Sequence, residues 1–258
     1  MPSGHRVPHL FRCWKQILPR IEKAQTVQLF LDFDGTLAPI HPSPKRVRLS
    51  EKLRRTLRRL SGNRRVHMAI VSGRRRGALR RFIGVPKIEL MGLFGWETNG
   101  ALTLPRKTRA ALPRLRSHLQ FVPAAYPGVF VEEKGVSLAI HFRKASAEVQ
   151  DRAHSGIRRL LLRFQPLFRV LPTNNAWEIV PREVQGKGFA VRDYMRGLHA
   201  RDLAIYLGDD LTDEPAFRAL RRGITIRVGP PAATKAHFRL DNPVEVNTFL
   251  ERLEEELS

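Results

Sequence analysis

Three short apolar runs constrain the fold of this 258-residue chain more than any other feature of its sequence. The runs begin at Val27, Val66 and Leu203, and each ends in Asp or Ser residues. Short apolar runs bounded by turn residues are typical of strands in a parallel sheet, because such strands are buried on both faces. The sequence therefore predicts parallel strands with polar groups at their ends.

The segment between the first two runs predicts a helix. Its leucines recur at intervals of three and four, which is the spacing of one buried helix face (Leu49, Leu53, Leu57 and Leu60). Ser50 suits the position before the first turn, and Gly62-Asn63 suits the end. A strand, a helix and a second strand in this order predict a right-handed crossover. The same style returns after residue 203, so we expect an α/β fold with a Rossmann-like core and a parallel sheet.

The middle of the chain has a different pattern. Helix-like and hairpin-like segments alternate there, and they cover 106–121, 129–143, 146–164 and 168–181. This order predicts an α+β module inserted into the α/β core. We therefore expect an N-terminal extension (1–24), a core in two pieces (25–103 and 183–258) and a cap domain (104–182).

Reactive side chains follow the three apolar runs. They are Asp32 and Asp34 after the first, Ser72 after the second, and Asp209, Asp210 and Asp213 after the third. Ligands of open α/β sheets bind outside the carboxyl ends of the strands, so these groups should converge. Five carboxylates in one crevice would repel one another unless a cation neutralised them. Oxygen ligands without Cys or His favour Mg²⁺ over zinc.

The same groups suit phosphoryl transfer. Alternation along an extended strand would place the Asp32 and Asp34 carboxylates on one side, where one can attack and the other can move a proton. Lys187, which precedes a predicted helix, can neutralise the phosphoryl oxygens. Turn residues that can offer N–H or hydroxyl groups to a phosphate are Gly35, Thr36, Ser72 and Gly73.

The chain is strongly basic, with 46 Lys and Arg against 24 Asp and Glu and a net charge of +22. A dense basic face can bind nucleic acid by releasing counterions. The arginine clusters at 54–59, 74–81 and 157–163 have helix-face spacing, however, and aromatic residues make up only 8% and are not interleaved with them. We therefore favour solvated basic faces that attract anionic substrates, and expect no specific nucleic-acid partner.

The composition excludes several other classes of protein. A single cysteine, Cys13, excludes a disulfide scaffold and a cysteine-rich zinc site. No apolar run approaches the roughly 18 residues of a membrane span, and the basic N-terminus lacks the apolar block of a signal peptide. We expect a cytoplasmic protein with no membrane partner. The oligomeric state does not follow from the sequence.

Four motifs in order resemble those of the haloacid dehalogenase (HAD) superfamily of aspartate-nucleophile phosphatases. They are DFDGT (32–36), VSGR (71–74), Lys187 and GDDLTDE (208–214). Over about 25–250 the chain is also similar to trehalose-6-phosphate phosphatases, on the segments LDFDGTLAPI, EEKGVSLAIHFR, WEIVP, GKGFAV and GDDLTDEPAF. This resemblance implies a HAD core with a cap, and a Mg²⁺-dependent hydrolase of trehalose biosynthesis that converts trehalose 6-phosphate into trehalose and phosphate.

The resemblance also implies roles for core residues. Asp32 would be the nucleophile and a metal ligand, and Asp34 the general acid and base, with its backbone carbonyl on the metal. Lys187 would bind the phosphoryl group together with Ser72. Asp209 would bind the metal, supported by Asp210 or Asp213.

In the predicted cap, Glu132, Lys134 and Glu178 match positions that bind glucose hydroxyls in the family. His141 and Arg143 match the His-aromatic-Arg strand of the family. We count these five residues, and Arg74 of the VSGR motif, among the candidate substrate-binding residues.

One stretch departs from the family pattern. Where the family has Gly-x-His-Gly-x-Glu, this chain has Gly92-Leu93-Phe94-Gly95-Trp96-Glu97, with Phe94 in place of histidine. The departure keeps a second interpretation open, a HAD phosphatase for another sugar phosphate such as glucosyl- or mannosyl-3-phosphoglycerate or sucrose phosphate. A catalytically silent sugar-phosphate sensor is a further alternative, which the complete set of motifs disfavours.

Overall fold

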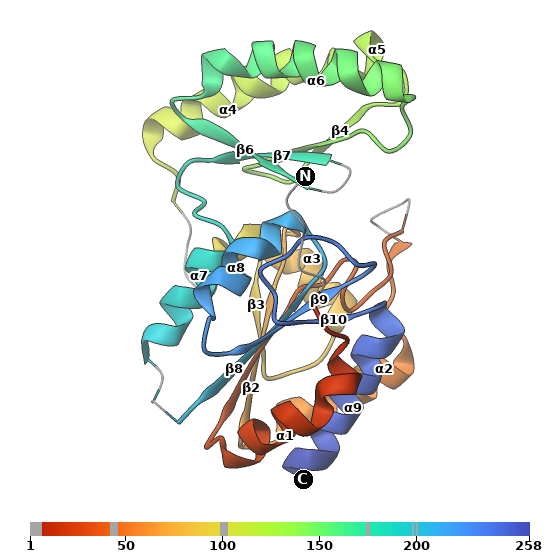
Figure 1. The fold of residues 1–258 in the computed structure, drawn as a ribbon. Coiled ribbons are helices and arrows are strands. Elements are labelled where there is room, and N and C mark those ends of the chain that lie inside the picture. Colours follow the sequence, from red (N-terminus) through yellow and green to blue (C-terminus); the bar gives the residue numbers. More distant parts are fainter. Residues whose placement is uncertain (1–6, 42–45, 99–102, 174–175, 198, 200) are drawn as a thin grey trace. The chain divides into compact units, whose positions relative to one another are not determined.

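The computed structural model describes residues 7–41, 46–98, 103–173, 176–197, 199 and 201–258 (Figure 1). The first six residues of the predicted N-terminal extension thus lie outside the described residues. The chain divides into two compact units, Met1–Gly100 with Gln185–Ser258 (unit 1) and Ala101–Val184 (unit 2). Among the described residues, no helix is long and apolar enough to cross a membrane.

Unit 1 is built on a six-stranded parallel sheet in the order β10-β9-β8-β1-β2-β3. The strands are β1 (Val27–Leu31), β2 (Val66–Val71), β3 (Ile88–Met91), β8 (Leu203–Gly208), β9 (Ile224–Val228) and β10 (Phe238–Leu240). The chain first adds strands on one side of β1 and later on the other. β1 and β8 therefore flank the point at which the strand order reverses, where ligands of such sheets bind.

Helices cover both faces of this sheet, which makes three layers. One layer holds α1 (Trp14–Lys23), α2 (Glu51–Gly62), α3 (Arg76–Ile83) and α9 (Pro243–Leu257), and the other holds α7 (Lys187–Tyr194) and α8 (Glu214–Ala219). Alternate residues of β1 serve the two cores: Leu29 and Leu31 pack with the first layer, and Phe30 packs with the second. The burial of β1 on both faces confirms the expectation of a parallel central strand.

Helix α2 begins where its sequence predicts. The Ser50 hydroxyl accepts a hydrogen bond from the Leu53 N–H at 3.1 Å, which satisfies one of the free donors of the first turn. Leu53, Leu57 and Leu60 are buried against the sheet, as their spacing indicates. The predicted α/β core is confirmed.

Unit 2 is a four-stranded antiparallel sheet with helices on one face (Figure 1). The sheet order is β4-β5-β7-β6, formed by Phe130–Glu133, Leu138–His141, Ala176–Pro181 and Phe168–Pro172 respectively. The helices are α4 (Arg106–Leu119), α5 (Val122–Ala125) and α6 (Ala147–Leu161). Its core gathers apolar residues of both layers, among them Leu115, Ile140 and Ile157. The predicted α+β insert is confirmed as a fold.

The N-terminal segment is part of unit 1. Leu10, Ile17 and Ile21 are buried in the core that contains α9, and His9 bridges Arg239 at the end of the sheet. The sequence predicts only an N-terminal extension here, over residues 1–24. Helix α1 runs through Pro19, and its buried apolar face packs against the core and stabilises it.

Candidate active site

Strand ends in unit 1 bring acidic side chains together. β1 and β8 are hydrogen-bonded neighbours, and the Asp32 N–H donates to the carbonyl of Leu207 at 2.9 Å. Asp32 follows β1, while Asp209 and Asp213 follow β8. One carboxylate oxygen from each of these three residues lies within 4.8 Å of the other two. We call this group the carboxylate cluster.

Lys187 joins two members of the carboxylate cluster. Its Nζ donates to Asp32 Oδ1 at 2.7 Å and to Asp213 Oδ1 at 2.8 Å. The lysine side chain is 2% exposed, so water does not screen these ion pairs. Lys187 is also the first residue of α7, where a cation is unfavourable next to the helix dipole. The two carboxylates offset that cost and hold the ammonium group in place.

Burial perturbs the ionisation of the cluster. It raises the pKa of Asp32 to about 7, against the opposing effect of Lys187. It also raises the pKa of Asp209 well above its ordinary value, with a further contribution from the negative charge of Asp32. For Lys187, burial lowers the pKa, but the carboxylates of Asp213 and Asp32 outweigh it and the net shift is upward. The cluster thus has more negative charge than its lysine can neutralise.

The donor set fits a divalent cation. Three buried carboxylates face one lysine, and an ion of charge two would balance the excess. All the donors are hard oxygen atoms, which Mg²⁺ prefers over the nitrogen and sulfur ligands typical of zinc. The residues present therefore suit magnesium, on the chemistry of the donors and on the raised pKa values of Asp32 and Asp209.

Gly35 makes the close approach of the two strand ends possible. Its φ of +86° lies in the left-handed region, and a Cβ at this position would lie 2.2 Å from Asp209 Oδ2. Only glycine fits both the conformation and the space. Its N–H donates to the carbonyl of Ala38 at 2.7 Å. The neighbouring Thr36 is fully buried, with its hydroxyl 3.5 Å from Asp209 Oδ1.

Asp34 is held by Arg74. The guanidinium Nε and one terminal nitrogen of Arg74 each donate to an oxygen of Asp34 at 2.6 Å, a bidentate ion pair. The same guanidinium carbon lies 5.3 Å from the ring centre of Phe33 and 4.8 Å from that of Phe82. Asp32 and Asp34 thus have different basic partners, although only one residue separates them.

Ser72 and Gly73 lie against the stretch that departs from the family pattern. Ser72 is 1% exposed, and its carbonyl accepts the Phe94 N–H at 2.8 Å. A Cβ on Gly73 would lie 2.8 Å from the tip of the Phe94 ring. Leu93 and Phe94 both have positive φ, 48° and 60°, which is uncommon for residues with a side chain. The structure therefore places Phe94 directly behind the Ser72-Gly73 turn.

Asp210 lies next to the carboxylate cluster in the chain but has a local partner. Its backbone N–H donates to Asp213 Oδ2 at 3.0 Å, and its side chain accepts a backbone N–H in a capping box. Of the acidic residues predicted for the metal, the structure brings together Asp32, Asp209 and Asp213, while Asp34 and Asp210 lie outside that group.

Tyr206 is a member of the site that sequence reasoning missed. It lies in β8, is fully buried, and donates from its hydroxyl to Asp213 Oδ1 at 2.7 Å. Burial and the charge of Asp213 raise the pKa of this phenol. The sequence did indicate a role for Tyr206, because a hydroxyl group inside an otherwise apolar buried strand requires a polar partner. Nothing in the sequence indicated that Phe82 would pack on Arg74.

Unit 2 carries a second group of polar residues. Glu132 on β4, His141 on β5 and Glu178 on β7 lie on one face of its sheet, because Ala139 pairs with both glutamates and His141 follows it by two residues. The His141 Nε2 and Glu132 Oε2 lie 2.9 Å apart, and the Lys134 Nζ donates to Glu178 Oε1. We call these four residues the polar face.

Glu178 has a free acceptor in this face. The residue is 5% exposed, and its Oε2 is buried with no hydrogen-bond partner. A buried carboxylate oxygen without a donor is costly, so a ligand hydroxyl placed there would be bound favourably. Arg143, predicted for the same site, is exposed and follows the end of β5.

Comparison with a family model agrees with this geometry. Residues 30–243 match the model described as trehalose-phosphatase. Trehalose 6-phosphate phosphatase RA3 of Zea mays is 31% identical over 257 residues, which are 90% of this chain and 70% of that protein.

Solved structures show the same fold. The C-terminal domain of the C. albicans trehalose-6-phosphate phosphatase superposes with a TM-score of 0.83 at 23% identity, covering 98% of this chain and 99% of that one. A haloacid dehalogenase-like hydrolase from Bacteroides thetaiotaomicron superposes with a TM-score of 0.61 at 16% identity, over 88% and 99% of the two chains.

Proposed function

The chain belongs to the trehalose-phosphatase family, has the HAD fold and is a phosphoric monoester hydrolase, and we propose that its substrate is trehalose 6-phosphate. The products would be trehalose and phosphate. In this proposal unit 1 is the catalytic core and unit 2 is the cap, close to the predicted cap of 104–182.

The carboxylate cluster with Lys187 is the observation that most supports the proposed reaction. Asp32 is the member with a phosphoryl-transfer role: a carboxylate oxygen attacks phosphorus, and the bond from phosphorus to the sugar oxygen breaks. Lys187, 2.7 Å from Asp32, offsets the charge on the phosphoryl oxygens as that bond breaks. Ser72 and Gly73 can donate a hydroxyl and an N–H to the same oxygens.

Asp34 moves the protons in this proposal. It gives a proton to the leaving sugar oxygen, and then takes one from the water that attacks the phosphate on Asp32. Hydrolysis releases phosphate and restores the Asp32 carboxylate, so the enzyme is unchanged. Because both Asp34 oxygens accept hydrogen bonds from Arg74 in this structure, at least one of those bonds has to break first.

Asp32, Asp209 and Asp213 would hold Mg²⁺, together with the backbone carbonyl of Asp34 and with Asp210 in support. When bound, the ion supplies positive charge that neutralises phosphate oxygens. The raised pKa of Asp32 supports this assignment, since its carboxylate form needs positive charge beyond that of Lys187.

We assign sugar recognition to the polar face of unit 2. Glu178 and Glu132 accept hydrogen bonds from sugar hydroxyls, and Lys134 and His141 hold the two carboxylates in position. Arg143 is retained as a candidate contact. The free Oε2 of Glu178 supports the assignment, because it needs a donor that the described residues do not supply.

The test is phosphate release from trehalose 6-phosphate with excess Mg²⁺ and after chelation. The expected result is turnover that chelator abolishes and added Mg²⁺ restores. Absence of turnover at saturating Mg²⁺ would overturn the assignment.

A phosphatase for another sugar phosphate is the second candidate, and Phe94 is the observation that favours it. The ring fills the space behind Gly73 where the family has histidine. A panel of glucosyl-3-phosphoglycerate, mannosyl-3-phosphoglycerate, sucrose phosphate and trehalose 6-phosphate separates the two. If kcat/KM is highest for trehalose 6-phosphate, the first candidate is supported. If kcat/KM is higher for any of the other sugar phosphates, the second candidate takes its place.

A further inference from the structure

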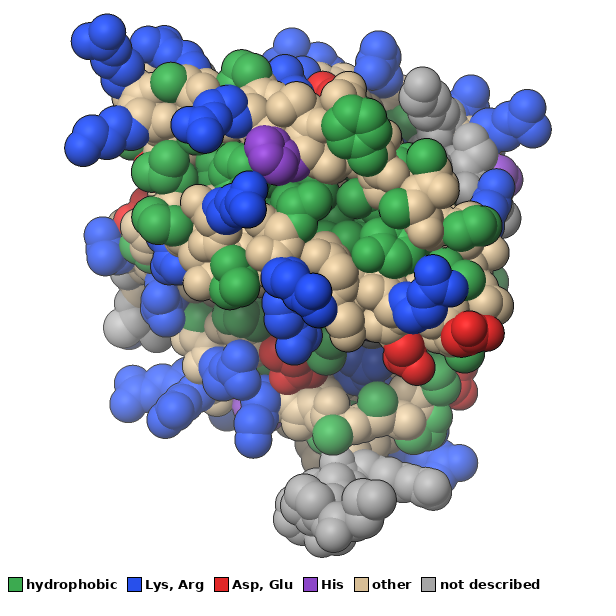
Figure 2. Space-filling view, turned by 90° about the horizontal axis from the view of Figure 1, so that it is seen from above, with side chains coloured by type: hydrophobic (Ala, Val, Ile, Leu, Met, Phe, Trp, Pro, Cys, Tyr) green, Lys and Arg blue, Asp and Glu red, His purple; other side chains and the backbone are tan. Residues whose placement is uncertain are grey.

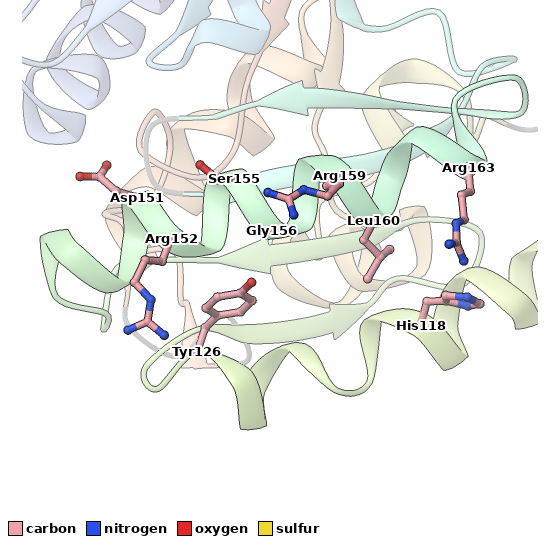
Figure 3. Close-up of a pocket in the computed structure, with 9 residues that line it drawn as sticks. All are labelled: His118, Tyr126, Asp151, Arg152, Ser155, Gly156, Arg159, Leu160 and Arg163. Carbon is pink, nitrogen blue, oxygen red and sulfur yellow. The ribbon is translucent and has the colours of Figure 1, made fainter.

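A groove on the helical layer of unit 2 lies among residues that the proposed function does not use. It runs between α6 and the segment of α4 and α5, with a volume of about 880 Å³ (Figure 3). Its lining residues are His118, Tyr126, Asp151, Arg152, Ser155, Gly156, Arg159, Leu160 and Arg163. Figure 2 views this layer from above and shows hydrophobic side chains exposed between basic ones.

Three arginines form one edge of the groove. Arg152, Arg159 and Arg163 stand at i, i+7 and i+11 of α6 and its continuation, so they share one side of the helix. All three are exposed, and among the described residues none of their guanidinium groups has a hydrogen-bond or ion-pair partner. At 1.5 Å per residue the row spans roughly 16 Å. In Figure 3, Arg152 and Tyr126 lie at one end, and Arg163 and His118 at the other.

The floor of the groove is made of small and apolar groups. Gly156 leaves room for Tyr126: a Cβ at Gly156 would lie 1.9 Å from the Tyr126 hydroxyl. Leu160, half-buried, continues the floor along α6. Two of the exposed large hydrophobic residues of the described chain, Phe121 and Leu162, belong to the same layer. The groove thus combines an apolar floor with a basic edge.

We propose that this groove binds an acidic, amphipathic helical segment of a partner protein. Such a segment places apolar side chains on the floor and Glu or Asp side chains opposite the arginine row. Charge complementarity supports this partner, because unit 2 has fourteen Lys and Arg against six Asp and Glu. The single carboxylate of the lining, Asp151, lies at the Arg152 end and leaves the row with net positive charge.

The length of the row argues against a small anion. One phosphate group cannot contact arginines separated by roughly 16 Å along a helix, whereas three turns of a helix can. Nucleic acid is less well matched, because single strands bind through several stacking aromatic residues and Tyr126 is the one aromatic ring besides His118 in the lining.

A second copy of this chain is also less well matched. Its acidic helix is α9, where Glu254, Glu255 and Glu256 lie near the end. The apolar side of that helix, including Leu253 and Leu257, is buried in the core of unit 1. α9 therefore cannot place apolar side chains in the groove of another copy.

The test measures binding of a fluorescent helical peptide of about 15 residues, with leucines every three and four positions flanked by glutamates, to the full chain. The groove variant is Arg152→Glu with Arg159→Glu and Arg163→Glu. The matched control reverses the same charge at three exposed arginines of unit 1, Arg218→Glu with Arg221→Glu and Arg222→Glu. Thermal melting checks that both variants fold, and phosphate release serves as a second check.

The expected result is that the groove variant weakens peptide binding at least about tenfold, while the control weakens it less than about threefold. Gly156→Ala, which leaves the charge unchanged and displaces Tyr126, should also weaken binding severalfold. A peptide with serine in place of leucine should lose most of its affinity.

Equal weakening by both triple variants would overturn the proposal, because it would show only the general positive field. If the serine peptide binds as tightly as the leucine peptide, the groove recognises charge alone and its ligand is a simple polyanion. The same conclusion follows if tripolyphosphate or a single-stranded oligonucleotide binds more tightly than the peptide and the groove variant abolishes that binding. If the chain forms dimers at raised protein concentration and these dimers no longer bind the peptide, the groove is occupied by a second copy of the chain.

Discussion

Two groups of charged residues, one in each unit, pair carboxylates with basic side chains in different proportions. The carboxylate cluster of unit 1 sets three carboxylates against one lysine, with the Asp32, Asp213 and Lys187 side chains at most 6% exposed. The polar face of unit 2 sets two carboxylates against one lysine and one histidine, with side chains 7% to 31% exposed.

The difference in charge balance supports the two different roles proposed for these groups. The cluster has uncompensated negative charge that raises the pKa of Asp32 and calls for a cation, which suits chemistry at a phosphate. In the polar face each carboxylate has its own basic partner, and a free oxygen on Glu178 is left for a hydroxyl. The comparison predicts that changes in the cluster abolish turnover, whereas changes in the polar face alter substrate selection.

The largest expected effect is that of Asp32→Asn. The amide keeps the shape but cannot form the bond to phosphorus, so kcat should fall by more than about 10⁴-fold for any phosphate ester. Phosphate release at saturating Mg²⁺ measures this. Asp193→Asn, at an exposed ion pair with Arg196, is the matched control and should keep normal turnover. Near-normal turnover of Asp32→Asn would show that Asp32 is not the nucleophile.

The second effect is a pH dependence of stability in the metal-free protein. Burial raises the pKa of Asp32 from 3.8 to about 7, so the contribution of this group to stability is full below pH 4 and is lost as the pH rises through 7. The loss is of the order of 2–4 kcal/mol. Urea unfolding from pH 5 to 8 without metal measures it. A shallower fall of the free energy of unfolding in Asp32→Asn than in the native chain identifies the group, with Asp209 accounting for the fall that remains. Parallel curves would contradict it.

The third effect concerns selection by the polar face. Glu178→Gln removes the charge that holds Lys134, and kcat/KM for trehalose 6-phosphate should fall about 10- to 100-fold. The rate with p-nitrophenyl phosphate, which has no sugar, should stay the same. Glu133→Gln, an exposed neighbour of the polar face that pairs with Arg116, serves as the control. An equal loss on both esters would show that Glu178 acts on structure and not on the sugar.

The smallest effect is that of Tyr206→Phe. Asp213 Oδ1 loses one of its two donors but keeps Lys187, so the free energy of unfolding should fall by about 1–2 kcal/mol and kcat by a few-fold. Denaturant unfolding and phosphate release measure the two. Tyr194→Phe, half-buried against Phe30, is the comparison variant. A loss of activity as large as that of Asp32→Asn would make Tyr206 a member of the reacting group.

The carboxylate cluster could be predicted from the sequence because the positions of its residues follow from local sequence patterns. An apolar run followed by Asp or Ser predicts a strand end, and parallel strands bring such ends to one edge of the sheet, which is where Asp32 and Asp209 meet. The helix start at Ser50 follows from the same kind of local rule.

Other parts of the site depend on contacts between distant segments. The ion pair of Asp34 with Arg74 joins residues forty positions apart. Phe82, on α3, packs its ring against the same Arg74 guanidinium. The left-handed conformation of Leu93 and Phe94 is opposed by their own propensities, and the Phe94 ring lies against Gly73, about twenty positions earlier in the chain. The polar face followed only from the family resemblance, since charged hairpin residues are ordinarily solvated.

The most direct measurement of the central claim is the shift in melting temperature that Mg²⁺ produces at pH 8 in the native chain and in Asp209→Asn. The native chain should melt at a higher temperature with Mg²⁺ than without it. The variant, which lacks one of the three carboxylates of the cluster, should show no shift with Mg²⁺. An equal Mg²⁺ shift in both proteins would show that the carboxylate cluster does not hold the ion.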